Sequence, residues 1–393
     1  MKSVLVVHNS YGSAAPSGED IVAEEESQLL RDHGIAVHRY TKASDGLREA
    51  NIGRLAWTAL QAPWAWSPLR ELSAMLRGCK PDIVHIHNTF PRISYSVVDL
   101  CSRSNIPCVV TLHNYRWICS NGVLLRDGVV CTECLDRGSV YPAMRHRCFR
   151  KSFLATLPIA TTIAFNRARR LLAKRVRAVI ALTEFQKAQL VRLQVPESKI
   201  FVKPNFVRSA GSVPSWEDRD LDFLFVGRIS EEKGLSVLLD AWRHLGCAAP
   251  RLTVIGDGRL RLALEARSPS NVEFIGMCSH DQVLGFMRRA RALLFPSIWF
   301  EGFPLAIVEA FSCGLAVLAS RIGGIPEIVR EEVSGELVEP GNVEAWAQAI
   351  RRWTDKPEIV AEMGQNARRA FEQFYTPARN IELLLEVYER ALT

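Results

Sequence analysis

The sequence lacks the long apolar run that a membrane-spanning helix needs. In the first half, the longest stretches without a charged residue are 55–69 and 152–166, each 15 residues long and containing proline. A bilayer takes about 20 apolar residues in one helix. The first eight residues carry one cation and too few apolar residues for the core of a secretion signal. We therefore predict a cytoplasmic protein without a transmembrane helix.

Low-complexity tracts and internal repeats are also missing, which argues against a disordered or repeat protein. Apolar residues make up 48% of the chain and charged residues 23%, as in ordinary globular proteins. A chain of 393 residues is too long for one ordinary core and fits two domains of roughly 150–200 residues. Its ten cysteines are expected to be reduced thiols, or metal ligands where they cluster.

Charge is divided unevenly along the chain. Residues 1–210 hold 29 Lys and Arg against 16 Asp and Glu, whereas residues 211–393 hold 20 against 26. Most of the basic excess lies in residues 101–210, which contain 19 basic and five acidic side chains. Such a basic surface suits phosphates, anionic lipid or nucleic acid, and the alternative is a solvated helix face.

Short apolar, β-branched runs alternate with helical segments in two series. This alternation predicts two parallel sheets, each covered by helices on both faces. Between the series, residues 208–220 are rich in serine, glycine and proline, as is typical of a linker. We predict an N-terminal domain over 1–207, a C-terminal domain over 221–375, and a last helix over 376–393 that packs back on the N-terminal domain. The predicted strands are 3–7, 36–40, 83–86, 108–112, 178–182 and 200–202, then 222–226, 252–255, 272–275, 292–295, 316–319 and 335–338.

Two cations follow the first strand of the second series. In open parallel sheets, ligands bind beyond the carboxyl ends of the strands. Gly227 lets the chain turn there, and Arg228 and Lys233 supply charges suited to a diphosphate. The alternative is a surface loop with scattered charges.

Glu309 is the one charged residue in the segment 302–320 and lies in an apolar, helix-like run. A carboxylate in such surroundings needs a hydrogen-bonding partner, from a ligand or from the protein. Glu301 precedes it at a predicted strand-to-helix turn, and Pro304 suits the first turn of a helix whose free N–H groups bind anions. The two glutamates are therefore predicted to accept hydroxyl groups of a ligand.

The second half carries a set of short motifs in a fixed order. They are Val226-Gly227-Arg228, Lys233-Gly234, Pro296-Ser297, Glu301-Gly302-Phe303-Pro304, Glu309-Ala310, Gly323-Gly324 and Gly335-Glu336-Leu337-Val338. This set resembles family 4 of the retaining glycosyltransferases, and the resemblance covers essentially all of residues 220–375. It implies an α/β protein of the GT-B fold, with two facing doubly wound Rossmann-like domains and a cleft between them.

The resemblance also implies roles for individual residues. Arg228 and Lys233 would hold the diphosphate of a nucleotide-diphosphate sugar donor. Glu301 would contact hydroxyls of the donor sugar and Glu309 the nucleotide ribose, with further donor contacts at Gly302, Phe303, Pro304 and Leu305. Two cations and a helix N-terminus would neutralise the leaving group, so the resemblance implies no catalytic metal or other cofactor.

In the first half, the likeness is carried by strand ends. Similar enzymes have two adjacent glycines where this chain has Ser17-Gly18, so Gly18 is assigned to the donor site and Ser17 departs from the pattern. His113 follows a strand and resembles the family's histidine beside the reacting sugar, where it would position a hydroxyl or stabilise developing charge. His85 and His87 are interpreted as structural.

A four-cysteine insert over about 115–150 goes beyond the common fold. Cys119, Cys131, Cys134 and Cys148 are spaced so that four thiolates could close a tetrahedral zinc site, with His146 as a substitute ligand. Asp127-Gly128 predicts a tight hairpin that leads into Cys131. A structural zinc is one hypothesis, and four reduced thiols are the other.

Two segments suggest a peripheral position at the inner face of a membrane. Trp57, Trp64 and Trp66 lie in an apolar segment, and packing in the core is the alternative to a membrane interface or an acceptor groove. The apolar segment that starts at residue 152 ends in a cluster of Arg and Lys over 167–177, which suits anionic lipid headgroups.

The sequence therefore predicts a retaining hexosyltransferase with a nucleotide-diphosphate sugar donor and a glycan or lipid-linked acceptor, serving surface polysaccharide assembly. A nucleotide-sugar epimerase of the same fold is one alternative. A basic, zinc-stabilised nucleic-acid-binding protein is the other, although nucleic acid would leave Arg228 and Glu309 unexplained. The sequence specifies neither the nucleotide, the sugar, the acceptor nor the linkage.

Overall fold

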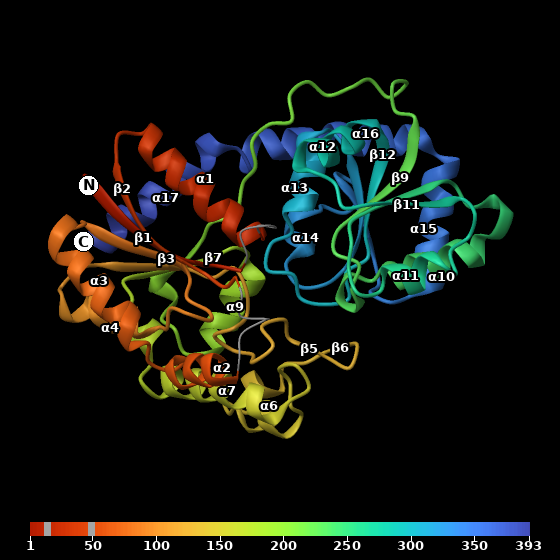
Figure 1. The fold of residues 1–393 in the computed structure, drawn as a ribbon. Helices are drawn as coiled ribbons and strands as arrows, with labels where there is room; N and C mark the ends of the chain where they lie inside the picture. Colours follow the sequence, from red (N-terminus) through yellow and green to blue (C-terminus); the bar gives the residue numbers. More distant parts are fainter. Residues whose placement is uncertain (12–16, 46–51) are drawn as a thin grey trace. The chain divides into compact units, whose positions relative to one another are not determined.

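The computed structural model describes residues 1–11, 17–45 and 52–393. Contacts along the chain group it into two compact units. The first comprises residues 1–124, 131–204 and 380–393, and the second comprises residues 125–130 and 205–379. Each unit is built around its own six-stranded parallel sheet with helices on both faces (Figure 1). The predicted α/β fold with two Rossmann-like sheets is confirmed.

The first sheet has the strand order β2-β1-β3-β4-β7-β8, and every neighbouring pair is parallel. Its central strands are buried on both faces, which explains why they are continuous apolar runs. The strands are β1 (Ser3–Ser10), β2 (Ala36–Ala43), β3 (Ile83–Asn88), β4 (Cys108–Thr111), β7 (Ala178–Ala181) and β8 (Ile200–Val202). The helices along this part of the chain are α1 (Gly18–Asp32), α2 (Ile52–Gln61), α3 (Trp66–Cys79), α4 (Ser96–Arg103), α5 (Glu133–Asp136), α6 (Tyr141–Arg145), α7 (Phe153–Ala168), α8 (Leu171–Lys174) and α9 (Glu184–Arg192).

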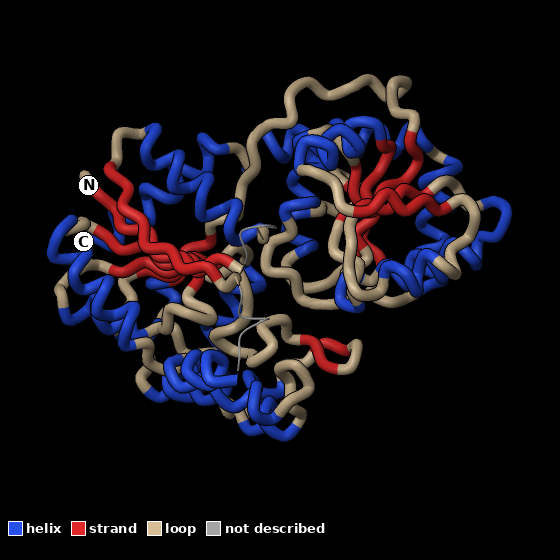
Figure 2. Tube along the Cα trace, in the orientation of Figure 1, coloured by secondary structure: helices blue, strands red, loops and turns tan. Residues whose placement is uncertain are grey.

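The second sheet has the order β11-β10-β9-β12-β13-β14 and is also parallel throughout. Figure 2 shows the strands of both sheets in red with helices in blue around them. Its core includes Trp242 and Trp346, both fully buried. The strands are β9 (Leu221–Val226), β10 (Leu252–Ile255), β11 (Val272–Gly276), β12 (Ala290–Phe295), β13 (Ala316–Ser320) and β14 (Gly335–Val338). The helices are α10 (Leu235–Leu245), α11 (Arg261–Glu265), α12 (His280–Arg289), α13 (Leu305–Ser312), α14 (Ile325–Ile328), α15 (Val343–Asp355), α16 (Pro357–Phe374) and α17 (Pro377–Leu392).

Each of the twelve predicted strands lies in a strand of the structure to within one residue, and the largest extensions are β1 and β2, which continue three residues further, to Ser10 and Ala43. The predicted tight hairpin is confirmed between β5 (Leu125–Arg126) and β6 (Val129–Val130). Asp127 and Gly128 both have positive φ, 51° and 78°. This is the backbone of the two-residue turns that match strand twist.

Helix α1 begins with a capping box. The hydroxyl of Ser17 accepts the backbone N–H of Asp20, and the carboxylate of Asp20 accepts the backbone N–H of Ser17 at 2.7 Å. Ser17 has a φ of −78°, so a residue with a side chain fits where similar enzymes have glycine. Ser17 thus fixes where the helix starts after the carboxyl end of β1.

Arg219 anchors the segment between the two sheets from within. Residues 205–220 contain no helix or strand, yet Arg219 is buried. Its guanidinium donates to the carbonyl oxygens of Ala290 at 2.6 Å and Cys313 at 2.8 Å. At the other end of the second unit, α17 crosses from residues 377–379 into residues that belong to the first unit.

Among the described residues, no helix is both long enough and apolar enough to cross a bilayer. The tryptophans of the segment 57–66 differ from one another. Trp57 is 62% and Trp66 67% exposed, so packing in the core is wrong for both. Trp64 instead packs edge-on against Phe165, with ring centroids 5.9 Å apart, because α2 lies against α7.

Candidate functional site

The loop after β9 is brought against the end of β12 by Gly234. This glycine has a φ of 71°, and a Cβ placed on it would lie 2.0 Å from the carbonyl oxygen of Pro296. A side chain at this position would force the two loops apart. Because the loops touch here, Lys233 can reach residues that follow β12.

Glu301 collects hydrogen bonds from three donors at that point. Its Oε1 accepts from Lys233 Nζ at 2.7 Å, Ser297 Oγ at 2.6 Å and Trp299 Nε1 at 2.9 Å. The side chain of Glu301 is 6% exposed and that of Lys233 is 19% exposed. Three donors on one oxygen hold the carboxylate in one position. The structure therefore brings together two of the predicted site residues, Lys233 and Glu301.

Arg228 lies in the same loop but has a different partner. Its Nη2 donates to Glu232 Oε1 at 2.7 Å, and its side chain is 63% exposed. Burial acts to raise the pKa of Glu232, but hydrogen bonds from Ser230 and Arg228 lower it below its usual value. Arg228 is thus a charged group oriented at the strand end by an ionised neighbour.

Glu309 lies on helix α13, one turn beyond its start. Burial raises the pKa of its carboxyl group, and the neighbouring His280, with Nδ1 3.6 Å from Oε1, acts in the opposite direction. Residues Gly302, Phe303 and Pro304 are buried and lead into the helix, whose first residue is Leu305. Pro304 is the N-cap, one position earlier than predicted, because its ψ of 102° is extended. The N–H groups after it are those that bind an anion at a helix start.

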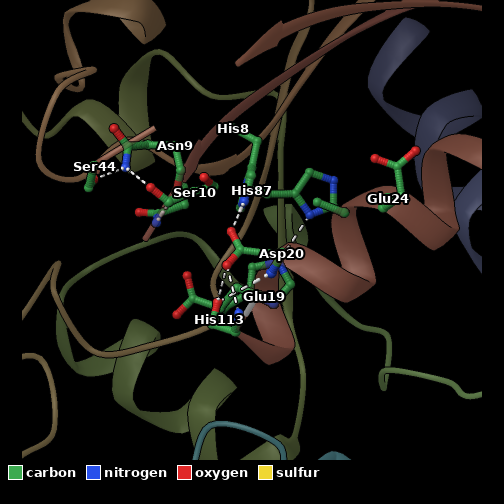
Figure 3. Close-up of polar contacts among 12 residues, drawn as sticks. His8, Asn9, Ser10, Glu19, Asp20, Glu24, Ser44, His87 and His113 are labelled. Atoms are coloured by element: carbon green, nitrogen blue, oxygen red, sulfur yellow. Dashed lines mark hydrogen bonds and ion pairs between the residues drawn. The ribbon is translucent and has the colours of Figure 1, made fainter. Parts of the chain in front are cut away.

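In the first unit, the ends of β1, β3 and β4 carry histidines that lie side by side (Figure 3). His113 is 8% and His87 5% exposed, and their rings stack with centroids 5.3 Å apart. Nδ1 of His87 is 3.0 Å from Nε2 of His113. Burial holds the pKa of both imidazoles well below the usual range. His113 therefore stands at a strand end as predicted, as a neutral imidazole.

His85 fits the structural interpretation. Its Nδ1 is 2.7 Å from the hydroxyl of Tyr388, and its Nε2 is 2.7 Å from the hydroxyl of Thr111. Burial lowers its pKa to about 4. Both ring nitrogens are engaged within the fold, so His85 ties α17 to the first sheet. Gly18, the predicted donor contact, is the first residue of α1 and is exposed.

Several polar residues at this edge were not predicted from the sequence. His8 Nε2 is 2.6 Å from Asp20 Oδ1, and Glu19 accepts the side-chain amide of Asn114 at 2.7 Å. Glu26 and Lys203 form an ion pair with both side chains 1% exposed. A signal for Glu26 was present: the positions three and four residues away on the helix are Val22, Ala23, Leu29 and Leu30, all buried.

Among the described residues, one cluster of side chains has the spacing of a metal site. The cluster comprises Glu26, His85 and His87, whose potential ligand atoms all lie within 4.8 Å of one another. The Lys203 ammonium at 2.5 Å from Glu26 Oε1 and the engaged nitrogens of His85 oppose a cation there. The four cysteines do not form such a group, although Cys131 lies near enough to Cys119 and Cys134 to influence the pKa of each. Burial raises the pKa of Cys134 to about 11, and the zinc site stays a prediction.

Two family models match the chain, one in each half. Glycosyltransferase Family 4 matches residues 16–210, and Glycosyl transferases group 1 matches residues 212–370. The chain belongs to the glycosyltransferases of the GT-B fold. The fold of this glycosyltransferase is similar to the crystal structure of Anabaena HepE in complex with UDP and glucose, with a TM-score of 0.66 and 17% sequence identity. The similarity covers 99% of this chain and 100% of the HepE chain.

Two curated relatives of this glycosyltransferase match over shorter regions. The amylovoran biosynthesis glycosyltransferase AmsK of Erwinia amylovora is 30% identical over 43% of this chain and 45% of its own length. The O-antigen chain mannosyltransferase C of Escherichia coli is 29% identical over 46% of this chain and 50% of its own. The match thus spans about half the length of these relatives.

Proposed function

We propose that this glycosyltransferase transfers a hexose from a nucleoside-diphosphate sugar to a glycan or lipid-linked acceptor, with retention of configuration, in surface polysaccharide assembly. The observation that carries the proposal is the pair of Lys233 and Glu301. It holds a cation suited to a diphosphate 2.7 Å from a carboxylate suited to sugar hydroxyls, beyond the carboxyl ends of β9 and β12. The HepE complex with UDP supports the donor class, and the two curated relatives support the pathway class.

The leaving group is a nucleoside diphosphate, and its departure builds negative charge on the terminal phosphate. Lys233 has three N–H donors, and Glu301 takes one of them. The remaining donors, the Arg228 guanidinium and the first N–H groups of α13 stabilise the charge as it forms. These fixed charges perform the task without a catalytic metal ion.

The donor's hydroxyl groups are received by carboxylates. Glu301 is oriented by its three donors and accepts from the sugar. Glu309 lies among apolar side chains of α13, where burial makes its charge unfavourable. Two ribose hydroxyls donating to it would supply the hydrogen bonds that the buried charge needs.

Retention requires the acceptor oxygen to bond to the anomeric carbon on the face that the diphosphate leaves. The bond from the anomeric carbon to the phosphate oxygen breaks, and its electron pair stays with the phosphate. The acceptor's hydroxyl proton passes to that phosphate oxygen. The test is the anomeric configuration of the product, read by proton NMR before it equilibrates, and a product of inverted configuration would refute this step.

A screen of nucleoside-diphosphate sugars tests the function as a whole. The expected result is transfer or slow hydrolysis with one nucleotide class, together with calorimetric binding of UDP or GDP. Conversion of the sugar without release of nucleotide would favour the epimerase. Binding of single-stranded RNA without binding of either nucleotide would favour the nucleic-acid-binding alternative.

The same protein is proposed to sit peripherally on the cytoplasmic face of an anionic membrane through α2 and α7, which lie against each other (Figure 1). The outward positions of α7 are uncharged, and Leu154 is 79% exposed. On α2, Trp57 and Leu60 are 62% and 76% exposed. Between residues 137 and 183 the sequence has eleven Lys and Arg and no Asp or Glu. Exposed apolar side chains flanked by cations are typical of helices that bind anionic lipid surfaces.

Flotation with lipid vesicles tests this position. We expect binding to vesicles that contain phosphatidylglycerol and little binding to pure phosphatidylcholine. The double variant Trp57→Ser with Leu154→Ser should lose flotation while keeping its melting temperature. Leu262→Ser, which removes an exposed leucine of α11, is the matched control and should float as the wild type does. Equal flotation of all three proteins would refute the membrane face.

A further inference from the structure

A buried carboxylate on α1 faces the histidines of the first unit. Glu26 is 1% exposed, and its Oε1 lies 2.5 Å from the ammonium of Lys203. Its Oε2 has no hydrogen-bond partner among the described residues and lies 3.7 Å from Nε2 of His87. The ammonium of Lys203 occupies one oxygen of the carboxylate, so the second oxygen presents negative charge to His87.

His87 directs its one N–H group toward the carboxylate oxygen of Glu26. Burial, and then the neighbouring His85 and His113, holds the pKa of His87 well below the usual range, so the ring is neutral and carries a single proton. A lone pair on Nε2 would face a carboxylate oxygen, which is repulsive, whereas an N–H there is attractive. The proton therefore lies on Nε2, and Nδ1 is left as an acceptor.

The position of the proton on His87 determines the position of the proton on His113. Nε2 of His113 is 3.0 Å from Nδ1 of His87, and two lone pairs cannot face each other at that distance. His113 is neutral as well, because burial lowers its pKa. Its proton must lie on Nε2 and point at His87. Nδ1 of His113 then carries a lone pair, at a residue that lines a small cavity with His87, Asn88 and Asn114.

Other charged or titratable groups around these rings are already engaged. His85, with its ring centroid 4.2 Å from that of His87, is held by Tyr388 and Thr111. The ring centroid of His8 is 6.3 Å from that of His87, and Nε2 of His8 is hydrogen-bonded to Asp20. Among these neighbours, Glu26 is the carboxylate whose unbonded oxygen lies opposite a nitrogen of His87.

We propose that Glu26 is a positioning residue that acts through His87 to hold His113 in the Nε2–H tautomer, so that Nδ1 of His113 accepts a hydroxyl of the bound substrate. The tautomer follows from this network alone, and the substrate hydroxyl rests on the proposed function. Of the two roles open for His113, this selects binding of a hydroxyl. A donor to developing negative charge would need the proton on Nδ1.

Glu26→Gln offers a specific test because it reverses the network. The carbonyl of the new amide must face the Lys203 ammonium, so its NH2 faces Nε2 of His87. Nε2 becomes an acceptor, the proton of His87 moves to Nδ1, and His113 must then carry its proton on Nδ1. Tyr388→Phe removes a hydroxyl from the same buried cluster without touching this chain of contacts and is the matched control.

The experiment is nitrogen-15 NMR of histidine-labelled full-length protein without ligand, because two-bond proton–nitrogen correlations distinguish the tautomers. We expect His113 to be the Nε2–H tautomer in the wild type and in Tyr388→Phe, and the Nδ1–H tautomer in Glu26→Gln. An Nδ1–H tautomer in the wild type overturns the proposal, and this result needs no variant to fold. An unchanged tautomer in folded Glu26→Gln overturns it too.

Transfer assays separate this inference from the proposed function. If the protein transfers sugar, Glu26→Gln should lower kcat/KM by about tenfold or more, the value of one hydrogen bond to substrate, and Tyr388→Phe should leave it near the wild-type value. A reversed tautomer with unchanged kcat/KM would overturn the substrate contact. If no donor is turned over while the tautomers are as expected, the proposed function fails and the tautomer assignment stands.

Discussion

Lys233 and Glu301 are joined by a 2.7 Å contact between Nζ and Oε1 although 68 residues separate them in the sequence. Arg228, five positions before Lys233, contacts Glu232 in its own loop instead. The two cations of the predicted diphosphate site therefore differ in what they support. Lys233 neutralises the buried carboxylate of Glu301. Arg228 is exposed and pairs with Glu232 in its own loop.

Arg228→Ala should lower turnover by about 10²–10³, or roughly 2.7–4 kcal/mol, because it removes a fixed charge that stabilises the leaving diphosphate. The melting temperature should change little, since an exposed ion pair contributes about 0–1 kcal/mol. Arg228→Lys should restore activity only in part, because a point charge lacks the two-pronged guanidinium contact. The measurement is turnover in EDTA with thermal melting beside it.

Arg259→Ala is the matched control, because Arg259 is an exposed arginine paired with Glu231 near the same loop. It should keep wild-type turnover. Wild-type activity in Arg228→Ala would refute the diphosphate role. Loss of wild-type turnover in EDTA, restored by magnesium, would show that a metal ion neutralises the leaving group.

Lys233→Ala should lower turnover to a similar degree but should also destabilise the fold. Glu301 would keep its hydrogen bonds from Ser297 and Trp299 and lose its ammonium partner. A buried acceptor that loses a charged partner costs about 1–3 kcal/mol. Ser297→Ala removes one neutral donor from the same oxygen and should lower the melting temperature less. A larger loss of stability in Arg228→Ala than in Lys233→Ala would contradict this assignment.

Glu309→Gln should weaken nucleotide binding by about 1.5–3 kcal/mol, as expected for loss of hydrogen bonds to a charged group. Burial raises the pKa of Glu309, so the folded protein holds this proton more tightly than the unfolded chain does. The stability associated with the protonated form is present below the ordinary pKa of about 4.5 and is lost as pH rises through the raised value. Gln has no such loss.

The melting temperature of Glu309→Gln relative to wild type should therefore increase between pH 4.5 and pH 8. Glu358→Gln, at an exposed position on α16, should show no such trend. Calorimetry with UDP and GDP measures the nucleotide affinity of Glu309→Gln and of the wild type. Nucleotide affinity equal to the wild type in a well-folded Glu309→Gln would remove the ribose contact.

The strands were predictable because the residue types within each strand reflect how deeply it is buried. A parallel strand buried on both faces must be a continuous apolar, β-branched run, so β9 and β12 could be located from residues 222–226 and 292–295 alone. The topology then places residues that follow those strands at one edge of the sheet. Lys233 and Glu301 were found by that reasoning, and the structure joins them.

Partners distant in sequence were not predictable in the same way. Lys203 and Glu26 are 177 residues apart, and each residue type is usually solvated. Glu26 also belongs to the run Glu24-Glu25-Glu26, which resembles an exposed acidic face. Only its spacing from the apolar residues of α1 marks it as buried, and nothing local identifies Lys203 as its partner.

The zinc hypothesis predicts near one zinc per chain in purified protein. Burial raises the pKa of Cys119 and Cys134, so zinc would have to displace the thiol protons in order to bind thiolates. The double replacement of Cys131 and Cys134 by serine should then lower the melting temperature without altering the transfer chemistry. Cys247→Ser, at an exposed cysteine outside the insert, is the control. Absence of zinc, with unchanged melting in the double variant, would leave four reduced thiols.

The buried histidines predict a loss of stability in mild acid. Burial lowers the pKa of His85, His87 and His113, to about 4 for His85. In the unfolded chain each takes up a proton near pH 6.5. Between pH 6.5 and the lowered pKa of the folded protein, these histidines are protonated in the unfolded chain and neutral in the folded protein. The stabilisation is therefore complete above about pH 6.5 and is lost as pH falls toward 4, at a slope of up to about 1.4 kcal/mol per pH unit for each histidine.

His113→Gln removes one of these groups, so its melting temperature should fall less steeply than that of the wild type between pH 6.5 and pH 4. His244→Gln replaces an exposed histidine on α10 and should follow the wild-type curve. Carboxyl groups titrate in the same range, and the comparison of variant with wild type cancels their contribution. Parallel curves for His113→Gln and wild type would mean that His113 is protonated as readily in the folded protein as in the unfolded chain. That result would also contradict the neutral imidazole on which a hydroxyl-accepting Nδ1 depends.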